Sequence, residues 1–197
     1  IVVRLVGSEM CIRDRSETIH NLRQCEAILT GFFERHDGRL FNTGGDSFLA
    51  EFSSAVSAVE CAVDFQHAIK LRNASDEATV KLEFRIGINS GDVVKEKDNL
   101  LGDGVNIAAR LEALAQTNGI TISKVIYDYV KGKTKYEFND LGLQKIKQNE
   151  FYAYDLLLDQ SQKRKLVKKK FSKATFALAC VSILTFAVFY FYMYKSG

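Results

Sequence analysis

The chain has 197 residues, 47% of them hydrophobic, with a formal net charge of +3. This length gives room for one domain with a buried core and a short appendage. The excess positive charge lies between Lys163 and Lys173 and the remainder is mildly acidic, which excludes a general nucleic-acid-binding surface. The four cysteines lack the paired spacing of zinc or redox sites, which indicates a reducing, cytosolic environment.

Hydrophobic periodicity predicts helices that alternate with hairpin-linked strands. In chain order we expect a helix at 17–36, a hairpin at 39–52, a helix capped by Ser53 or Ser54 and running past Ile69, a strand at 82–88 with a partner around Val93 and Val94, a helix within 101–112, a strand at 120–122, a helix at 123–130 and closing strands at 136–141 and 151–156. The pattern indicates an α+β fold, a ferredoxin-like antiparallel sheet covered by helices on one face.

The C-terminal end predicts a membrane anchor. No charged residue occurs in the 21 residues of segment 174–194, which as a helix would span roughly 30 Å, the thickness of a bilayer core. Three tyrosines gather at its far end and a basic stretch, 159–173, precedes it. This arrangement predicts that everything upstream stays in the cytoplasm. A buried core helix is the alternative interpretation.

Segment 101–112 is the most informative part of the chain. A glycine-flanked turn precedes a helix on which Asn106 and Arg110 stand one turn apart on the same face. An amide beside a planar cation with five donors suits a phosphorylated ligand. Taken alone, the segment could equally be a capped surface helix with a solvated arginine.

Three blocks of sequence, 38–52, 84–92 and 101–112, resemble the catalytic domain of class III nucleotidyl cyclases, within a collinear match over 16–155. The resemblance implies conversion of ATP or GTP to a 3′,5′-cyclic nucleotide and pyrophosphate. Two Mg²⁺ or Mn²⁺ ions would bridge two aspartates and the triphosphate. It also implies sites shared between the subunits of a head-to-tail homodimer, with metal aspartates from one subunit and the Asn/Arg helix from the other.

The same resemblance implies roles for individual residues. Asp46, in the Gly-Gly-Asp turn, would bind metal, although an ordinary turn aspartate is the alternative. Asn106 would orient the ribose and Arg110 would stabilise charge in the transition state. Lys147 would contact the terminal phosphates, with a solvated surface lysine as the competing interpretation.

Two departures from the family pattern matter. Asn42 and Asn99 stand where the family often has a lysine and an aspartate that select the base; an amide can read either purine. Residues 1–15 do not resemble the opening strand that carries the first metal aspartate. They look like a translated sequencing-adapter remnant rather than a signal peptide. We therefore expect this chain to be inactive or nearly so, with its native start near Ser16 and a continuation beyond Gly197.

The resulting division is a non-native segment at 1–15, a cyclase catalytic domain without its first strand at 16–158, a basic juxtamembrane linker at 159–173 and a transmembrane helix at 174–194. The expected location is a bacterial inner membrane, with the catalytic domain on the cytoplasmic side. Three alternatives remain: a degenerate cyclase-like module that dimerises or binds nucleotide, a diguanylate cyclase, disfavoured because Ser47 follows the Gly-Gly-Asp turn, and a membrane-tethered scaffold.

Overall fold

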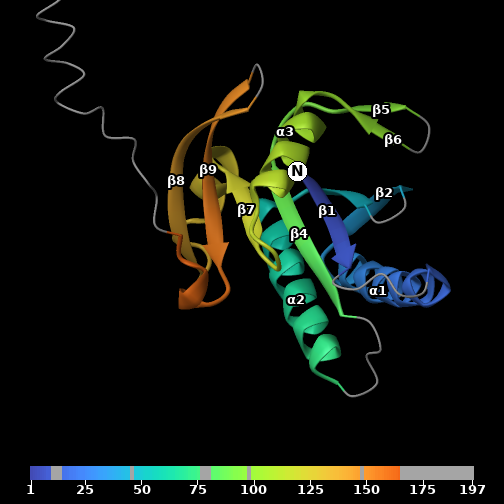
Figure 1. Cartoon of the computed structure of the whole chain (residues 1–197). Coiled ribbons are helices and arrows are strands. Elements are labelled where there is room, and N and C mark those ends of the chain that lie inside the picture. Colours follow the sequence, from blue (N-terminus) through green and yellow to red (C-terminus); the bar gives the residue numbers. More distant parts are fainter. Residues whose placement is uncertain (10–14, 45–46, 76–80, 97–98, 147–148, 165–197) are drawn as a thin grey trace, which may run out of the picture. The chain divides into compact units, whose positions relative to one another are not determined.

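The computed structural model describes residues 1–9, 15–44, 47–75, 81–96, 99–146 and 149–164. Its nine strands are β1 (Val2–Glu9), β2 (Gly38–Gly44), β3 (Ser47–Phe52), β4 (Leu82–Asn89), β5 (Val94–Glu96), β6 (Asn99–Leu101), β7 (Ile120–Ser123), β8 (Glu137–Ile146) and β9 (Asn149–Leu157). Seven of them form a sheet in the order β2-β3-β1-β4-β7-β9-β8 (Figure 1). Neighbours run antiparallel except β4 and β7, which are parallel.

The helices of the described part are α1 (Arg15–Arg35), α2 (Ala55–Ala74), α3 (Asp103–Leu114), α4 (Lys124–Val130) and a short 3₁₀ helix, η1 (Gln160–Gln162). All four predicted α-helices are confirmed within a few residues. Ser54 caps α2, since its hydroxyl accepts a hydrogen bond from the Ser57 amide at 3.3 Å.

Helices cover both faces of the sheet, which corrects the prediction of a single covered face. Along β4, Phe84 and its even-numbered neighbours join the core cluster that contains α1 and α2 residues. Arg85 instead reaches Glu112 of α3, and a side chain at Gly87 would collide with α3. Because successive strand residues face opposite sides, α3 lies on the face opposite α2.

The opening strand is present, so the prediction that the first strand is missing is wrong. β1 lies between β3 and β4, with Val3, Leu5 and Val2 almost completely buried. A central strand requires apolar, preferably β-branched residues that alternate between the faces, and residues 2–6 satisfy this without the family's motif. The proposal that 1–15 is non-native remains a prediction.

The segment after β4 also differs from the prediction. Val94 does not pair with β4; β5 pairs with β6 in a separate two-stranded ribbon. The two closing strands, β8 and β9, are longer than expected. No helix among the described residues is long and apolar enough to cross a membrane, and the predicted span at 174–194 lies outside those residues.

Candidate active site

The α3 helix presents the two residues singled out in the sequence. Asn106 is exposed in its first turns, and Arg110 follows one turn later and is half-buried. Among the described residues, the buried Nη1 of Arg110 has no hydrogen-bond partner. A buried guanidinium nitrogen without a partner is costly, so Nη1 of Arg110 is available to donate a hydrogen bond to an anionic oxygen.

Glycines bring α3 unusually close to the sheet. A Cβ at Gly87 would lie 2.2 Å from the Ala108 carbonyl oxygen and 2.3 Å from the Glu112 nitrogen. Gly102, which precedes the helix, has φ +133°, a conformation that side chains rarely adopt. Asn89 donates from Nδ2 to the Gly104 carbonyl at 3.1 Å. These contacts place the start of α3 directly over the end of β4.

A buried carboxylate fixes the last turn of α3 to the strands. Glu112 is 5% exposed; its Oε1 lies 3.2 Å from Nε of Arg85 and its Oε2 lies 3.9 Å from Nε of Arg4. No role for Glu112 is predicted from the sequence. Glu112 follows Ala108 by four residues, so both lie on the side of α3 that faces the sheet, and this spacing could have indicated that Glu112 is buried.

A small apolar cluster gathers three of the predicted site segments. It comprises Val2, Leu49, Leu100 and Ala108, with Phe41, Val93 and Val105 packed against them. Phe41 precedes Asn42, Leu100 follows Asn99 and Val105 precedes Asn106. The backbones that carry the three asparagines therefore converge from β2, β6 and α3, as a site assembled from distant segments requires.

Two cations that the sequence analysis did not single out stand beside this cluster. The Arg39 guanidinium lies 4.9 Å from the centroid of the Phe41 ring, and the Lys95 ammonium lies 5.6 Å from it. Both distances are within the range of a cation–π interaction. Two cationic groups therefore lie beside Phe41, where they could attract an anionic ligand.

Asp46 and Lys147 lie outside the described residues, so the structure does not test their roles. β2 and β3 pair up to Gly44 and Ser47, which confirms the hairpin that carries Asp46. β1 runs beside it, with Val6 opposite Ser47.

Within the described part of the chain, β1 does not supply the second aspartate that a two-metal centre would need beside Asp46. The described residues contain no group of three or more His, Cys, Asp or Glu side chains able to hold a metal ion. β1, the strand next to the hairpin, has Glu9 at its end as its acidic residue and contains no aspartate. A second carboxylate beside Asp46 is therefore lacking in this strand.

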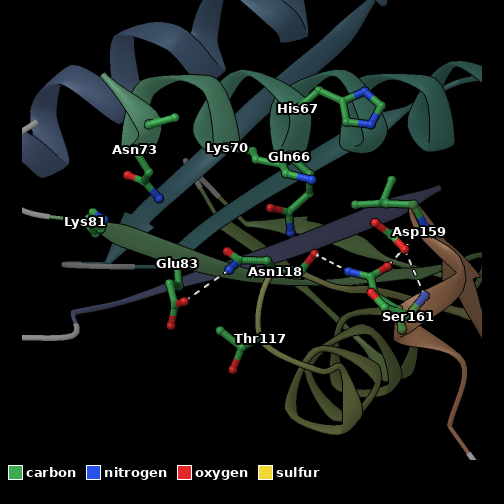
Figure 2. A pocket seen from close by; sticks show the side chains of 13 residues that line it. Gln66, His67, Lys70, Asn73, Lys81, Glu83, Thr117, Asn118, Asp159 and Ser161 are labelled. Carbon is green, nitrogen blue, oxygen red and sulfur yellow. Dashed lines mark hydrogen bonds between the residues drawn. The ribbon is translucent and has the colours of Figure 1, made fainter. Parts of the chain in front are cut away.

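A pocket of about 510 Å³ lies elsewhere (Figure 2). Residues of the second half of α2, the start of β4, the loop after α3 and the segment around η1 line it, and none of them is a predicted site residue. Hydrogen bonds join residues that line this pocket; for example, Nδ2 of Asn118 donates to Oε1 of Glu83 at 3.2 Å. Hydrogen bonds from Ser161 hold the pKa of Asp159 below its ordinary value.

Known proteins identify the fold and the family. Residues 6–157 match the family described as adenylate and guanylate cyclase catalytic domain. A putative adenylate cyclase 3 from Rhizobium meliloti is 41% identical over 145 residues, which are 73% of this chain and 24% of that relative. The chain thus spans about a quarter of that protein.

Solved structures agree. An adenylate/guanylate cyclase/hydrolase from Silicibacter pomeroyi aligns with a TM-score of 0.71 and 28% identity, over 80% of this chain and 96% of that one. The catalytic core of a rhodopsin-guanylyl cyclase in complex with ATPαS shares the fold, with a TM-score of 0.67 and 24% identity over 79% and 94% of the two chains. The chain therefore belongs to the adenylate and guanylate cyclase catalytic domain family.

Proposed function

We propose that the domain binds ATP or GTP and, in a form with a complete metal site, converts it to the 3′,5′-cyclic nucleotide and pyrophosphate. The observation that carries the proposal is the buried Nη1 of Arg110, without a partner among the described residues and one turn from Asn106. In a cyclase-family domain, such a guanidinium group is suited to an α-phosphate. The ribose 3′-hydroxyl loses its proton to solvent and its oxygen bonds to the α-phosphorus, while the bond from that phosphorus to the oxygen bridging to the β-phosphate breaks and pyrophosphate leaves.

Each site residue has a proposed task in this reaction. Arg110 stabilises the negative charge that builds on the α-phosphate oxygens. Asn106 orients the ribose, Asn42 and Asn99 read the purine through their amides, and Lys147 binds the terminal phosphates. The family's Mg²⁺ or Mn²⁺ pair would be held in part by Asp46. Because β1 offers no second aspartate, we propose that this chain is impaired in turnover.

The site is proposed to form between two copies of the chain, with the α3 residues of one facing the Asp46 hairpin of the other. In support, Asn106 is exposed on α3. Sedimentation of the purified chain with and without nucleotide tests this point, and a strictly monomeric species under both conditions would contradict it.

We further propose a membrane location, with the cyclase domain on the cytoplasmic side. The basic stretch 159–173 and the uncharged segment 174–194 of the sequence support it. Alkaline extraction of membranes from expressing cells tests the anchor. Recovery of the chain in the extracted fraction would contradict it.

Turnover of labelled ATP and GTP with Mn²⁺ tests the activity. Val6 lies opposite Ser47 and on the α3 side of β1, since Val2 and Arg4 of that strand contact α3 elements. We expect no product from the chain as it is and recovered product from Val6→Asp. Val6→Asn, of the same shape but uncharged, is the matched control, and adding Arg110→Ala to Val6→Asp should abolish the gain.

The alternative is a degenerate cyclase-like domain that dimerises or binds nucleotide for regulation. Asn42 and Asn99, in place of the family's base-selecting pair, favour it. Nucleotide binding without product from both Val6→Asp and a chain given a complete family-like opening strand would support this alternative.

A further inference from the structure

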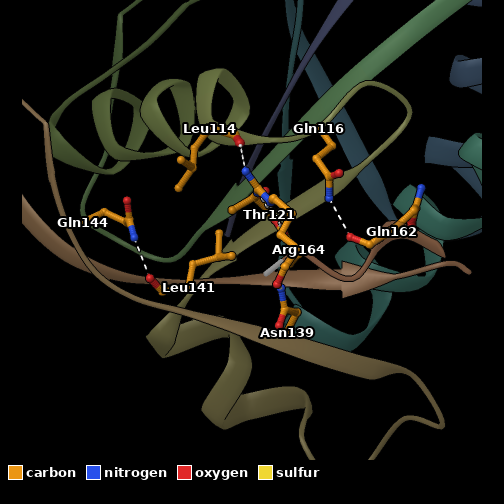
Figure 3. A network of polar contacts seen from close by, with 9 residues as sticks. Leu114, Gln116, Thr121, Asn139, Leu141, Gln144, Gln162 and Arg164 are labelled. Carbon is orange, nitrogen blue, oxygen red and sulfur yellow. Dashed lines mark hydrogen bonds and ion pairs between the residues drawn. The ribbon is translucent and has the colours of Figure 1, made fainter. Parts of the chain in front are cut away.

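The segment that follows β9, residues 158–164, is bound along the end of α3 and the loop after it. We refer to these residues as the C-terminal strap. Nε2 of Gln116 donates to the Gln162 carbonyl at 2.7 Å, and Nε2 of Gln162 donates to the Asn118 carbonyl at 3.3 Å. The Leu158 amide donates to Oε1 of Gln162 at 3.1 Å, which fixes the orientation of that amide group. Figure 3 shows the hydrogen bond between Gln116 and Gln162.

Arg164 is the last residue of the strap and its strongest contact. Its Nε and Nη2 bind the two carboxylate oxygens of Asp155 at 2.6 and 2.5 Å. Its Nη1 donates to the Leu114 carbonyl at 3.1 Å (Figure 3). Asp155 is 4% exposed and also accepts a hydrogen bond from Oγ1 of Thr121 at 2.7 Å. The Arg164 carbonyl accepts from Nδ2 of Asn139 at 3.2 Å. Arg164 thus joins α3, β8 and β9, and its partner Asp155 links β9 to β7.

The bond to Leu114 acts on the helix that carries the proposed site. The final carbonyls of an α-helix have no partner within the helix, and a cation near this end is favourable. Leu114 lies four residues after Arg110, hence one turn further along the same side of α3. Contacts with the sheet hold α3 from its start to Glu112, and Arg164 binds the carbonyl of its last residue, Leu114.

We infer that Arg164 is a positioning residue for the nucleotide site, because it binds the end of the helix that carries Asn106 and Arg110. The nucleotide part of this inference rests on the proposed function, whereas the hold on α3 does not.

Hydrogen exchange on the full chain tests the hold. In Arg164→Ala we expect amides of residues 112–119 to exchange about tenfold faster or more, because a hydrogen bond from a charged group is lost at the helix end. Lys163→Ala is the matched control, since Lys163 is exposed and adjacent, and it should leave the exchange unchanged. Exchange in Arg164→Ala within about twofold of the parent chain, or equal acceleration in Lys163→Ala, would overturn the inference.

Arg164→Lys separates positioning from simple stabilisation. A lysine keeps a charge opposite Asp155 but has no planar fork to bind Asp155 and Leu114 together. We expect it to recover most of the melting temperature while exchange at 112–119 stays fast, and it carries the test if Arg164→Ala fails to fold. If Arg164→Lys restored both the melting temperature and the slow exchange at residues 112–119, the role of Arg164 would be purely structural and the inference would be overturned.

Affinity for a fluorescent ATP analogue with Mn²⁺ is the second measurement. If the parent chain binds it, both Arg164 variants should bind more weakly than Lys163→Ala, and equal affinities would overturn the positioning role. Failure of the parent chain to bind would refute the proposed nucleotide site and with it the nucleotide part of the inference. Whether Arg164 holds the end of α3 is decided by the hydrogen-exchange measurement alone.

Discussion

Gly87 is the position at which the contact between α3 and the sheet can be tested most directly. The substitution Gly87→Ala adds a single methyl group to β4, on the side that faces α3. That methyl carbon would lie 2.2 Å from the Ala108 carbonyl oxygen and 2.3 Å from the Glu112 nitrogen, whereas ordinary contacts begin at 3.4 Å. Both atoms belong to the α3 backbone, so no side-chain rotation relieves the clash and the helix itself must move away from the sheet.

The cost follows from this geometry. Overpacking a well-packed contact costs about 1–3 kcal/mol, and a backbone clash belongs at the upper end of that range. For a chain of this size, each kcal/mol lowers the melting temperature by roughly 2–4 °C, so we expect a loss of about 6–12 °C. A shift of α3 by about 1 Å would also displace Asn106 and Arg110, and misplacement on this scale can cost about 100-fold in a catalysed rate.

Thermal melts and binding of a fluorescent ATP analogue with Mn²⁺ check this prediction. Gly31→Ala in α1 is the matched control, because a Cβ there meets nothing within 4 Å. It should stabilise the chain by about 0.5–1 kcal/mol through helix propensity. A Gly87→Ala variant that melts at or above the parent temperature would refute the close approach of α3. Normal analogue binding in a destabilised Gly87→Ala variant would refute the dependence of the site on α3.

Three further predictions concern the core, a buried thiol and a surface ion pair. Phe84 is fully buried and in edge-to-face contact with Phe65. We expect Phe84→Ala to lower the free energy of unfolding, measured with urea, by about 3–5 kcal/mol. A decrease below about 1 kcal/mol would contradict this packing. Burial raises the pKa of Cys61 to about 12, so in a variant with Cys61 as its single cysteine, Ellman's reagent at pH 8 should react only after denaturant is added. Hydrogen bonds from Lys124 and Lys131 lower the pKa of Asp128 below its ordinary 3.8. Its stabilising effect is therefore present above that pH and lost as the pH falls through the folded-state pKa. The melting temperatures of Asp128→Asn and the parent chain should differ at pH 7 and converge near pH 2, and a gap that persists in acid would contradict this assignment.

Much of the fold could be predicted from the sequence because it depends on local periodicity. The helix over 17–36 corresponds to α1, and the alternation of Phe84, Ile86 and Ile88 with polar residues marks β4. Asn106 and Arg110 share a helix face simply because they are four residues apart, and that prediction needed no tertiary information. The residue blocks 38–52, 84–92 and 101–112 were enough to indicate the family that the comparisons show.

Other features depend on contacts between distant segments, which one sequence does not display. Period-2 alternation shows that β4 has two faces, but α3 covers the second face only because Gly87 admits its backbone. β1 lies inside the sheet, between β3 and β4, through burial of Val2, Val3 and Leu5, although it carries no aspartate.

The sequence by itself determined the family, the helix that bears Asn106 and Arg110, and the absence of an aspartate from residues 2–9. Each of these depends only on residue type and on the spacing between residues that are close in the chain. Only the tertiary structure revealed what holds that helix. Glu112 meets Arg85 across the sheet, and Arg164 reaches Leu114 from fifty residues further along the chain. Such contacts form because folding buries charges that must then find partners, and the chain separation between those partners follows no period.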